Sequence, residues 1–364
     1  MNGLRRSLPD FPWDALAPAK KRAAEHPDGI VDLSMGTPVD PVPAAVQAAL
    51  AGAADSPGYP LTAGSPALRA AITDWVTRNC GISDGFGVLP TIGSKELVAG
   101  LPTLLGLGAG DVVVIPSVCY PTYDVGARLA GAEVVRSDDP AAEVDPERVR
   151  LVWLNSPGNP SGRVLPPAKI AETIGWARAA GAVVASDECY LSLGWEPSAP
   201  PVSALGVAGA DGVLAVHSLS KRSNLAGYRA GFVAGDPELV GELLEVRKHS
   251  GLIVPAPVQA AMVAALGDEA HVEAQRALYA ARRDALAGAL AGAGFRVDDS
   301  EAGLFLWVTD GTPCWESVER LATLGILAVP GEFYGPAGAT HVRVALTASD
   351  DRVAAAVARL RARI

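Results

Sequence analysis

The stretch GVLAVHSLSKRSNLAGYR, residues 212–229, joins an apolar run to a polar segment that begins where the run ends. Residues 212–217 have the composition of a buried strand, and Lys221 follows among serines and ahead of Arg229. A lysine amine condenses with an aldehyde, whereas serine hydroxyls and a guanidinium group bind a phosphate dianion. The stretch therefore predicts a site for a phosphorylated aldehyde. A plain polar turn after a strand would have the same local sequence.

Length, charge and cysteine usage exclude several classes of protein. The chain has 364 residues, of which 49% are hydrophobic, and its formal net charge is -10. This size exceeds one compact core, so we expect two domains, and the negative charge argues against nucleic acid or an anionic membrane as partner. The four cysteines are far apart and the histidines are scattered, which favours reduced thiols and no metal site. We see no signal peptide or membrane-spanning segment and expect a cytoplasmic protein.

Short apolar runs alternate with helical patterns through the middle of the chain, which is typical of an α/β fold with a mostly parallel sheet. Polar residues follow the runs, and in such sheets these strand ends meet around the ligand. Long Ala-rich helices and two strand patterns follow residue 255, as expected for a second, smaller α+β domain. The strands are expected at 111–115, 149–154, 182–186, 212–217 and 231–234, and the helices at 95–105, 123–129, 168–179, 257–266 and 270–291. The expected divisions are an N-terminal arm that forms part of the small domain (1–40), a large cofactor-binding domain (41–254) and a small C-terminal domain (255–364).

Pyridoxal phosphate is the common biological molecule with both an aldehyde and a phosphate, and its ring nitrogen needs a carboxylate partner. Asp187 directly follows the apolar run 183–186 and is well placed for that task. Tyr190 and Asn159 could donate hydrogen bonds to the phenolic oxygen of the ring. Two alternatives remain: Asp187 could belong to a helix N-cap, and residues 159–162 could form a type I turn.

The order and spacing of Asn159, Asp187, Lys221 and Arg229 resemble those of the fold-type-I pyridoxal phosphate aminotransferases over nearly the full chain. The resemblance implies a mostly parallel seven-stranded sheet in a large domain. It also implies that Lys221 is the catalytic lysine attached to the cofactor and that Asp187 pairs with the ring nitrogen. Tyr190 and Asn159 would bind the ring oxygen. The phosphate would be held by Ser218, Ser220 and Arg229.

Other segments match the same family. Gly93, Ser94 and Lys95 begin a helical pattern whose free amides could bind the phosphate, and Tyr120 is at the position of the aromatic ring that stacks on the cofactor. The resemblance implies that Arg343, Gly36 and Asn159 bind the α-carboxylate of an amino acid or 2-oxo acid. Tyr59 corresponds to a tyrosine that reaches the cofactor phosphate of the other subunit, so we expect a homodimer with shared active sites. From the residues alone, Tyr120 could equally be a core tyrosine and Arg343 a solvated strand residue.

Residues 217–229, together with 93–96 and 247–251, resemble the succinyldiaminopimelate aminotransferases of lysine and diaminopimelate biosynthesis. Those enzymes interconvert N-succinyl-LL-2,6-diaminopimelate plus 2-oxoglutarate with the succinylamino keto acid plus glutamate. Because such a substrate carries extra carboxylates, another cation should face the pocket. Arg22, Arg163 and Lys248 are candidates, although a surface charge is the more common interpretation of each. The open alternatives are an aminotransferase for LL-diaminopimelate or aspartate, a carbon-sulfur lyase on the same fold, and a cofactor-binding regulator.

Overall fold

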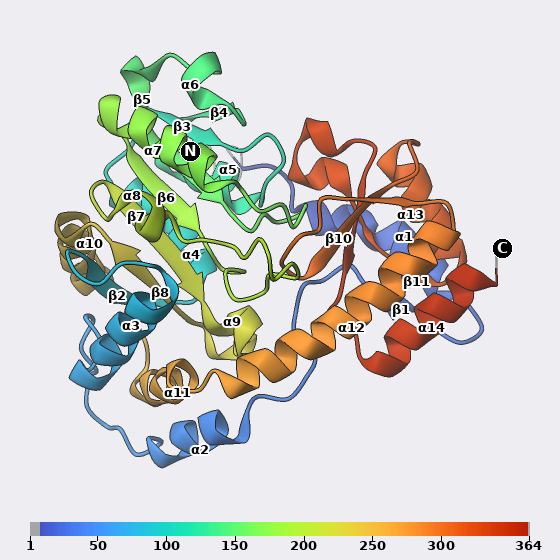
Figure 1. Cartoon of the computed structure of the whole chain (residues 1–364), viewed down its shortest axis with the longest axis horizontal. Coiled ribbons are helices and arrows are strands. Elements are labelled where there is room, and N and C mark those ends of the chain that lie inside the picture. Colours follow the sequence, from blue (N-terminus) through green and yellow to red (C-terminus); the bar gives the residue numbers. More distant parts are fainter. Residues whose placement is uncertain (1–7, 363–364) are drawn as a thin grey trace, which may run out of the picture.

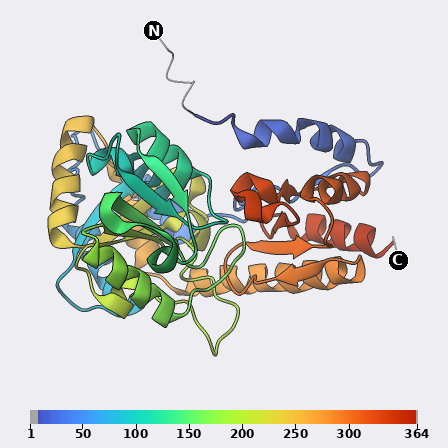
Figure 2. The same cartoon turned by 90° about the horizontal axis from the view of Figure 1, so that it is seen from above.

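The computed structural model describes residues 8–362, which form two parts joined by a long helix, α12 (Ala270–Gly292). Figure 1 shows the larger part around a twisted sheet, with α12 running from beneath it into the smaller part. Figure 2 shows the N-terminal helices and α12 on opposite sides of the smaller part. The first seven residues of the expected N-terminal arm lie outside the described residues.

The larger part contains a seven-stranded sheet that is mostly parallel, which confirms the expected fold class. Its strand order is β2-β8-β7-β6-β5-β3-β4, and only β8 runs antiparallel to its neighbours β2 and β7. The strands are β2 (Gly87–Ile92), β3 (Val112–Ile115), β4 (Glu133–Arg136), β5 (Val149–Asn155), β6 (Val183–Asp187), β7 (Val213–Ser218) and β8 (Ala230–Gly235).

The two strands that the sequence patterns did not predict, β2 and β4, are the edges of this sheet. β2 contains Pro90, which weakens a strand pattern but is tolerated where one side of the backbone has no strand neighbour. β4 is short and charged at both ends, with half-buried residues between, so it lacks the apolar run of a central strand.

Helices bury both faces of the sheet, as its apolar strands require. Residues of α3, α7, α8 and α11 form a core on one face, and residues of α4, α5 and α10 form a core on the other. The helices of this part are α2 (Ala44–Gly52), α3 (Pro66–Asn79), α4 (Ser94–Leu104), α5 (Thr122–Ala130), α6 (Pro140–Glu143), α7 (Pro167–Ala179), α8 (Ala204–Ala208), α9 (Leu219–Arg222), α10 (Pro237–Ser250) and α11 (Ala256–Leu266).

The smaller part is built from both ends of the chain. Its antiparallel sheet has the order β12-β13-β10-β9, and β1 (Val31–Asp32) pairs in parallel with β11 (Ile326–Leu327). The remaining elements are the 3-10 helix η2 (Pro12–Leu16), α1 (Ala17–Ala24), β9 (Arg296–Asp298), β10 (Phe305–Thr309), α13 (Cys314–Thr323), β12 (Val329–Pro330), the 3-10 helices η5 (Gly331–Tyr334) and η6 (Pro336–Gly338), β13 (Val342–Ala345) and α14 (Asp350–Arg361).

The expected division at residues 254 and 255 assigns α11 to the small domain. α11 packs against α2 and α3, however, and its buried residues Ala261, Met262 and Ala265 belong to a core of the large sheet. We therefore propose that the smaller part begins with α12. The limits 1–40, 41–254 and 255–364 otherwise stay predictions. No helix within residues 8–362 combines the length and apolarity needed to cross a membrane.

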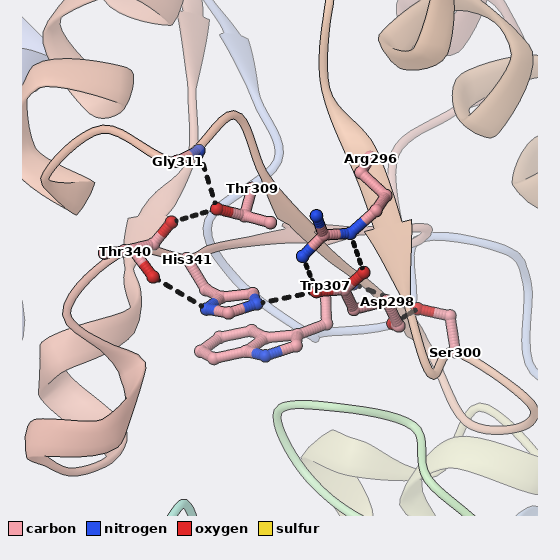
Figure 3. A network of polar contacts seen from close by, with 8 residues as sticks. All are labelled: Arg296, Asp298, Ser300, Trp307, Thr309, Gly311, Thr340 and His341. Atoms are coloured by element: carbon pink, nitrogen blue, oxygen red, sulfur yellow. Dashed lines mark hydrogen bonds and ion pairs between the residues drawn. The ribbon is translucent and has the colours of Figure 1, made fainter.

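A polar network fixes the strands of the smaller sheet relative to one another (Figure 3). The Asp298 carboxylate accepts a 2.5 Å hydrogen bond from Nε of Arg296 and lies 3.0 Å from Nε2 of His341. The His341 ring stacks on Trp307 of β10, with ring centroids 4.9 Å apart. The network joins β9, β10 and the residue before β13, and β13 carries Arg343 opposite Trp307.

Candidate active site

A cavity of about 780 Å³ lies where β5, β6 and β7 end and the two parts of the molecule meet. Nearly all of the predicted site residues line it. Tyr59 is not among the described residues that line the cavity; its side chain is 99% exposed. Gly93 lies beside it, against Arg229. The predicted residues in its wall are Gly36, Ser94, Lys95, Tyr120, Asn159, Asp187, Tyr190, Ser218, Ser220, Lys221, Arg229 and Arg343.

Lys221 reaches the cavity from the short helix α9, which begins directly after β7. Its Nζ donates a hydrogen bond to the carbonyl oxygen of Gly36 in the N-terminal segment. Burial, together with the cations Arg343 and Arg229, lowers the pKa of Lys221 to about 8. A lysine in these surroundings has a substantial neutral fraction near physiological pH, which nucleophilic or base chemistry requires.

Asp187, the last residue of β6, is a buried carboxylate that faces the cavity. It accepts hydrogen bonds from the Tyr123 hydroxyl at 2.8 Å and from the Cys189 backbone amide at 3.2 Å. Burial raises its pKa, and no cationic side chain of residues 8–362 forms an ion pair with it. A protonated pyridine nitrogen would supply the missing positive charge, so this wall fits pyridoxal phosphate.

Another part of the cavity wall fits a phosphate. Ser218, Ser220 and Arg229 meet the first turn of α4 there. Gly93 precedes α4 with φ +71°, and a Cβ at this position would lie 2.3 Å from Nη2 of Arg229. The guanidinium group therefore lies directly against Gly93, the residue before the N-terminus of α4, and the guanidinium group and the helix N-terminus both attract an anion.

Arg343 on β13 provides a second, buried cation. Its Nη1 donates to Oδ1 of Asn159 at 3.0 Å and its Nη2 donates to the Ser34 carbonyl at 2.6 Å. The guanidinium carbon lies 4.0 Å from the centre of the Phe305 ring, and Nε has no hydrogen-bond partner among the described residues. Gly36 packs against the same ring, because a Cβ there would lie 2.5 Å from Phe305. This fixed cation is suited to a carboxylate.

Several residues that shape the site were not assigned a role from the sequence. Tyr123 stacks on Trp153 at 4.6 Å and so aims its hydroxyl at Asp187. Asn155 accepts from the Asn159 amide at 2.8 Å and donates to the Asp187 carbonyl at 3.0 Å, which fixes the loop after β5 against β6. Each lies next to a predicted motif in the sequence, but their orientations depend on contacts between distant segments.

The N-terminal segment contributes an aromatic wall to the cavity. Phe11, Trp13 and Met35 line the cavity. The ring centroids of Phe11 and Trp13 are 5.5 Å apart. Trp13 also packs against Phe333 of the smaller part at 5.9 Å. The Pro-rich composition of this segment carries no periodicity from which such a position could be predicted.

The three candidate cations for the distal carboxylates of a substrate lie elsewhere. Arg22 and Lys248 form surface ion pairs with Glu25 and Glu245, and Arg163 is exposed outside the cavity wall. Lys95 lines the cavity instead, and no carboxylate of residues 8–362 forms an ion pair with it. From its position at the start of a helical pattern, Lys95 was predicted only to help bind the cofactor phosphate.

Behind the cavity wall, the fold gathers Cys80, Glu188 and His217, although they are scattered in the sequence. Glu188 and His217 neighbour Asp187 and Ser218 but point to the other face of the sheet. The His217 Nε2 atom lies 3.8 Å from Sγ of Cys80 and 3.6 Å from Oε2 of Glu188. Burial lowers the pKa of His217 to about 3 and raises the pKa of Glu188 to about 7. The expectation of no metal stays a prediction.

Comparison with known proteins agrees with this geometry. The family described as "Aminotransferase class I and II" matches residues 28–360. The 4-dedimethylamino-4-oxo-anhydrotetracycline transaminase of Streptomyces rimosus is 59% identical and covers 98% of this chain and 99% of its own. A probable aminotransferase of Mycobacterium tuberculosis is 60% identical over 98% of this chain and 86% of its own.

Among solved structures, a probable N-succinyldiaminopimelate aminotransferase from Thermus thermophilus superposes with a TM-score of 0.87. It is 29% identical, over 97% of this chain and all of its own. The family match spans most of the chain and the two relatives exceed half identity. The chain therefore belongs to the class I and II aminotransferases, which depend on pyridoxal 5'-phosphate.

Proposed function

We propose that this aminotransferase transfers the amino group of N-succinyl-LL-2,6-diaminopimelate to 2-oxoglutarate, in the biosynthesis of diaminopimelate and lysine. The observation that carries amino transfer is the convergence of Lys221, Asp187 and Arg343 on one cavity. The finer substrate assignment is supported by Lys95, a further cation in the cavity wall that is available to a distal carboxylate. A Thermus thermophilus structure with this named activity shares the fold over nearly the whole chain.

Each residue has a distinct task in this proposal. The bound cofactor supplies an electron-withdrawing ring that stabilises negative charge at the substrate α-carbon. Asp187 pairs with the ring nitrogen, Asn159 and Tyr190 bind the ring oxygen, and Tyr120 covers the ring. Ser94, Ser218, Ser220 and Arg229 hold the phosphate with the amides that follow Gly93. Arg343, with Gly36 and Asn159, binds the α-carboxylate.

Lys221 acts as the base in this scheme. Its amine would hold the cofactor, and the same amine, when free, would remove the α-proton of the bound amino acid. The cations Arg343 and Arg229 lower the pKa of Lys221 in addition to its burial, so the amine is usable near pH 8. 

We further propose a homodimer in which Tyr59 completes the partner's phosphate site. Its side chain projects with 99% of its surface exposed, which leaves it available to another subunit. A cytoplasmic location likewise stays a prediction.

A second amino acceptor has specific support. Phe11, Trp13, Met35 and Phe305 give the cavity an apolar, largely aromatic side. The Streptomyces rimosus relative, 59% identical, is named for a substrate with a 4-oxo group on an anhydrotetracycline skeleton. A polycyclic ketone could pack against these side chains with its carbonyl toward Lys221.

A panel of amino donors with 2-oxoglutarate tests the proposal. Glutamate formation from N-succinyl-LL-2,6-diaminopimelate should be faster than from LL-diaminopimelate or aspartate. Fast turnover of another donor with none of the succinylated compound would contradict it. Amination of 4-dedimethylamino-4-oxo-anhydrotetracycline by glutamate would favour the second candidate. Pyruvate and ammonia released without any 2-oxo acid would indicate a carbon-sulfur lyase.

A further inference from the structure

The three residues that follow Lys221 are all bound by the beginning of α12 and the turn before it. These residues lead from the lysine to the phosphate-site residue Arg229. Their partners lie outside the cavity wall. The contacts are Arg222 Nη2 to Glu269 Oε2 at 2.9 Å, Ser223 Oγ to His271 Nε2 at 2.8 Å, and Asn224 Nδ2 to Gln275 Oε1 at 2.7 Å.

The last of these contacts continues into a buried bridge. Gln275 accepts from Asn224 with its side-chain oxygen and donates from Nε2 to Oδ2 of Asp40 at 2.8 Å. Asn224 also donates to the Pro41 carbonyl at 3.3 Å. Arg282 binds both carboxylate oxygens of Asp40, at 2.6 and 2.8 Å. Asn224 and Gln275 are 9% and 6% exposed, so each would be costly to leave without partners.

Asp40 and Gln275 lie on the two segments by which the chain crosses between the larger and smaller parts. The first crossing, residues 33–43, carries Gly36, whose carbonyl accepts from Lys221. It also carries Ser34, whose carbonyl accepts from Arg343. The second crossing is the start of α12, which extends along the smaller part and packs against α14. The bridge therefore ties both crossings to the loop that follows Lys221.

The backbone conformation of Asn224 favours asparagine at this position of the loop. Its φ is +58°, in the left-handed region that asparagine tolerates better than most residues. The side-chain amide then points to Gln275 and Pro41, so the conformation of the loop and its attachment to α12 depend on each other.

We infer that Gln275 is a positioning residue for amino transfer, through which carboxylate binding at Arg343 is transmitted to Lys221. A carboxylate that binds Arg343 acts on the smaller part and on the Gly36 crossing, and the Asp40–Gln275–Asn224 bridge moves the lysine loop with them. The inference rests on the roles proposed above for Arg343 and Lys221. Such coupling is reciprocal, so the state of Lys221 also changes carboxylate affinity.

Two measurements on the holoenzyme test it. The first is the limiting single-turnover rate with saturating glutamate. The second is the pH midpoint of the cofactor's visible absorbance, with and without glutarate, which has the carboxylates of glutamate but no amine. Glutarate should raise this midpoint in the wild type by about one pH unit, because it neutralises Arg343 and engages the bridge.

Gln275→Leu keeps the side-chain volume and removes both hydrogen bonds of the bridge. It should lower the limiting rate about tenfold and at least halve the glutarate-induced change of the midpoint, while glutarate still binds at the intact Arg343. Asn224→Gly, which accepts the positive φ, should have the same effect and serves if Gln275→Leu fails to fold. The double variant should lose no more than Asn224→Gly alone, because that substitution already removes the Gln275 contact together with those to Pro41 and Tyr279.

Ser223→Ala is the matched control, because it removes a neighbouring contact between the same loop and α12 but leaves the bridge intact. It should match the wild type in both measurements. Wild-type behaviour of Gln275→Leu and Asn224→Gly would overturn the inference, as would an equal loss in Ser223→Ala. If the wild type itself shows no cofactor absorbance that depends on Lys221, the proposed function fails instead.

Discussion

At Lys221, one amine is placed among two cations and a backbone carbonyl, and this environment determines when the amine can accept a proton. Arg343 and Arg229 oppose its protonation, in addition to the loss of hydration on burial. The Gly36 carbonyl gives it a fixed direction. The same cation that binds the substrate thus helps to keep the base neutral.

The pH dependence of the first half-reaction follows from this arrangement. The pKa of Lys221 is lowered to about 8, so the neutral fraction increases as the pH rises through that value. With an amino donor at saturation, the single-turnover rate should rise from pH 6 and level off above about 8. Stopped-flow absorbance between pH 6 and 9.5 checks this. Lys221→Ala should abolish the signal with the fold intact, and a flat profile in the wild type would contradict the assignment.

We expect binding of the substrate α-carboxylate to depend on the geometry of the Arg343 guanidinium group and not only on its charge. Arg343→Lys would keep a cation but lose the fork of donors and the stacking on Phe305. KM should rise about 10- to 100-fold, or roughly 1.5–3 kcal/mol of binding, similarly for every amino donor because all share the α-carboxylate. Arg343→Ala should behave likewise. An unchanged KM for all donors would remove Arg343 from the carboxylate site.

Glu188, behind Asp187, should affect stability and not substrate affinity. Burial raises its pKa from 4.5 to about 7, so the folded state binds more protons than the unfolded chain between these values. The contribution of Glu188 to stability should therefore fall as the pH rises from about 4.5 to 7. His217, whose pKa is lowered to about 3, contributes the opposite slope, so Glu188→Gln should make stability rise more steeply with pH across this range. Thermal unfolding across this range measures the slope. An unchanged slope in the variant would show that Glu188 is not the responsible group.

The start of α4 places cofactor and substrate groups on one helix end. Ser94 and the amides after Gly93 face the phosphate site, whereas Lys95 is the cation left for a distal carboxylate. Lys95→Ala should raise KM for the succinylated donor about tenfold while that for alanine is unchanged, because alanine has no distal carboxylate. Cofactor affinity, measured in parallel, serves as the control. A loss of cofactor affinity with no selective change in KM would assign Lys95 to the phosphate.

The central strands and the residues at their ends could be predicted from the sequence, because a buried parallel strand followed by a polar residue leaves a clear local pattern. Asp187 at the end of β6 and Lys221 after β7 are examples. The pattern fails where burial is incomplete, as at β2 and β4. It also fails where position depends on distant partners. The choice of Lys95 over Arg22, Arg163 and Lys248 depends on which side chains face the cavity, and spacing does not encode this.

At the scale of the whole molecule, the exposed Tyr59 predicts that activity is a property of two chains. Lys221→Ala and Tyr59→Ala chains, co-expressed, should form heterodimers in which one site has an intact Lys221 and receives an intact Tyr59 from the partner. At limiting cofactor, the heterodimer should be more active than either parent dimer. Activity equal to the mean of the two parents would mean that the sites are not shared.

The parallel pairing of Val31–Asp32 with Ile326–Leu327 has a consequence for synthesis. The strands of the large sheet, from β2 to β8, are synthesised before α12, so the phosphate-binding part of the site can form while the chain is still growing. The N-terminal segment must wait for nearly the entire chain before it finds its neighbours. Arg343 and its partner Ser34 come together last, so a nascent chain can hold the cofactor end of its site before it can bind an amino acid.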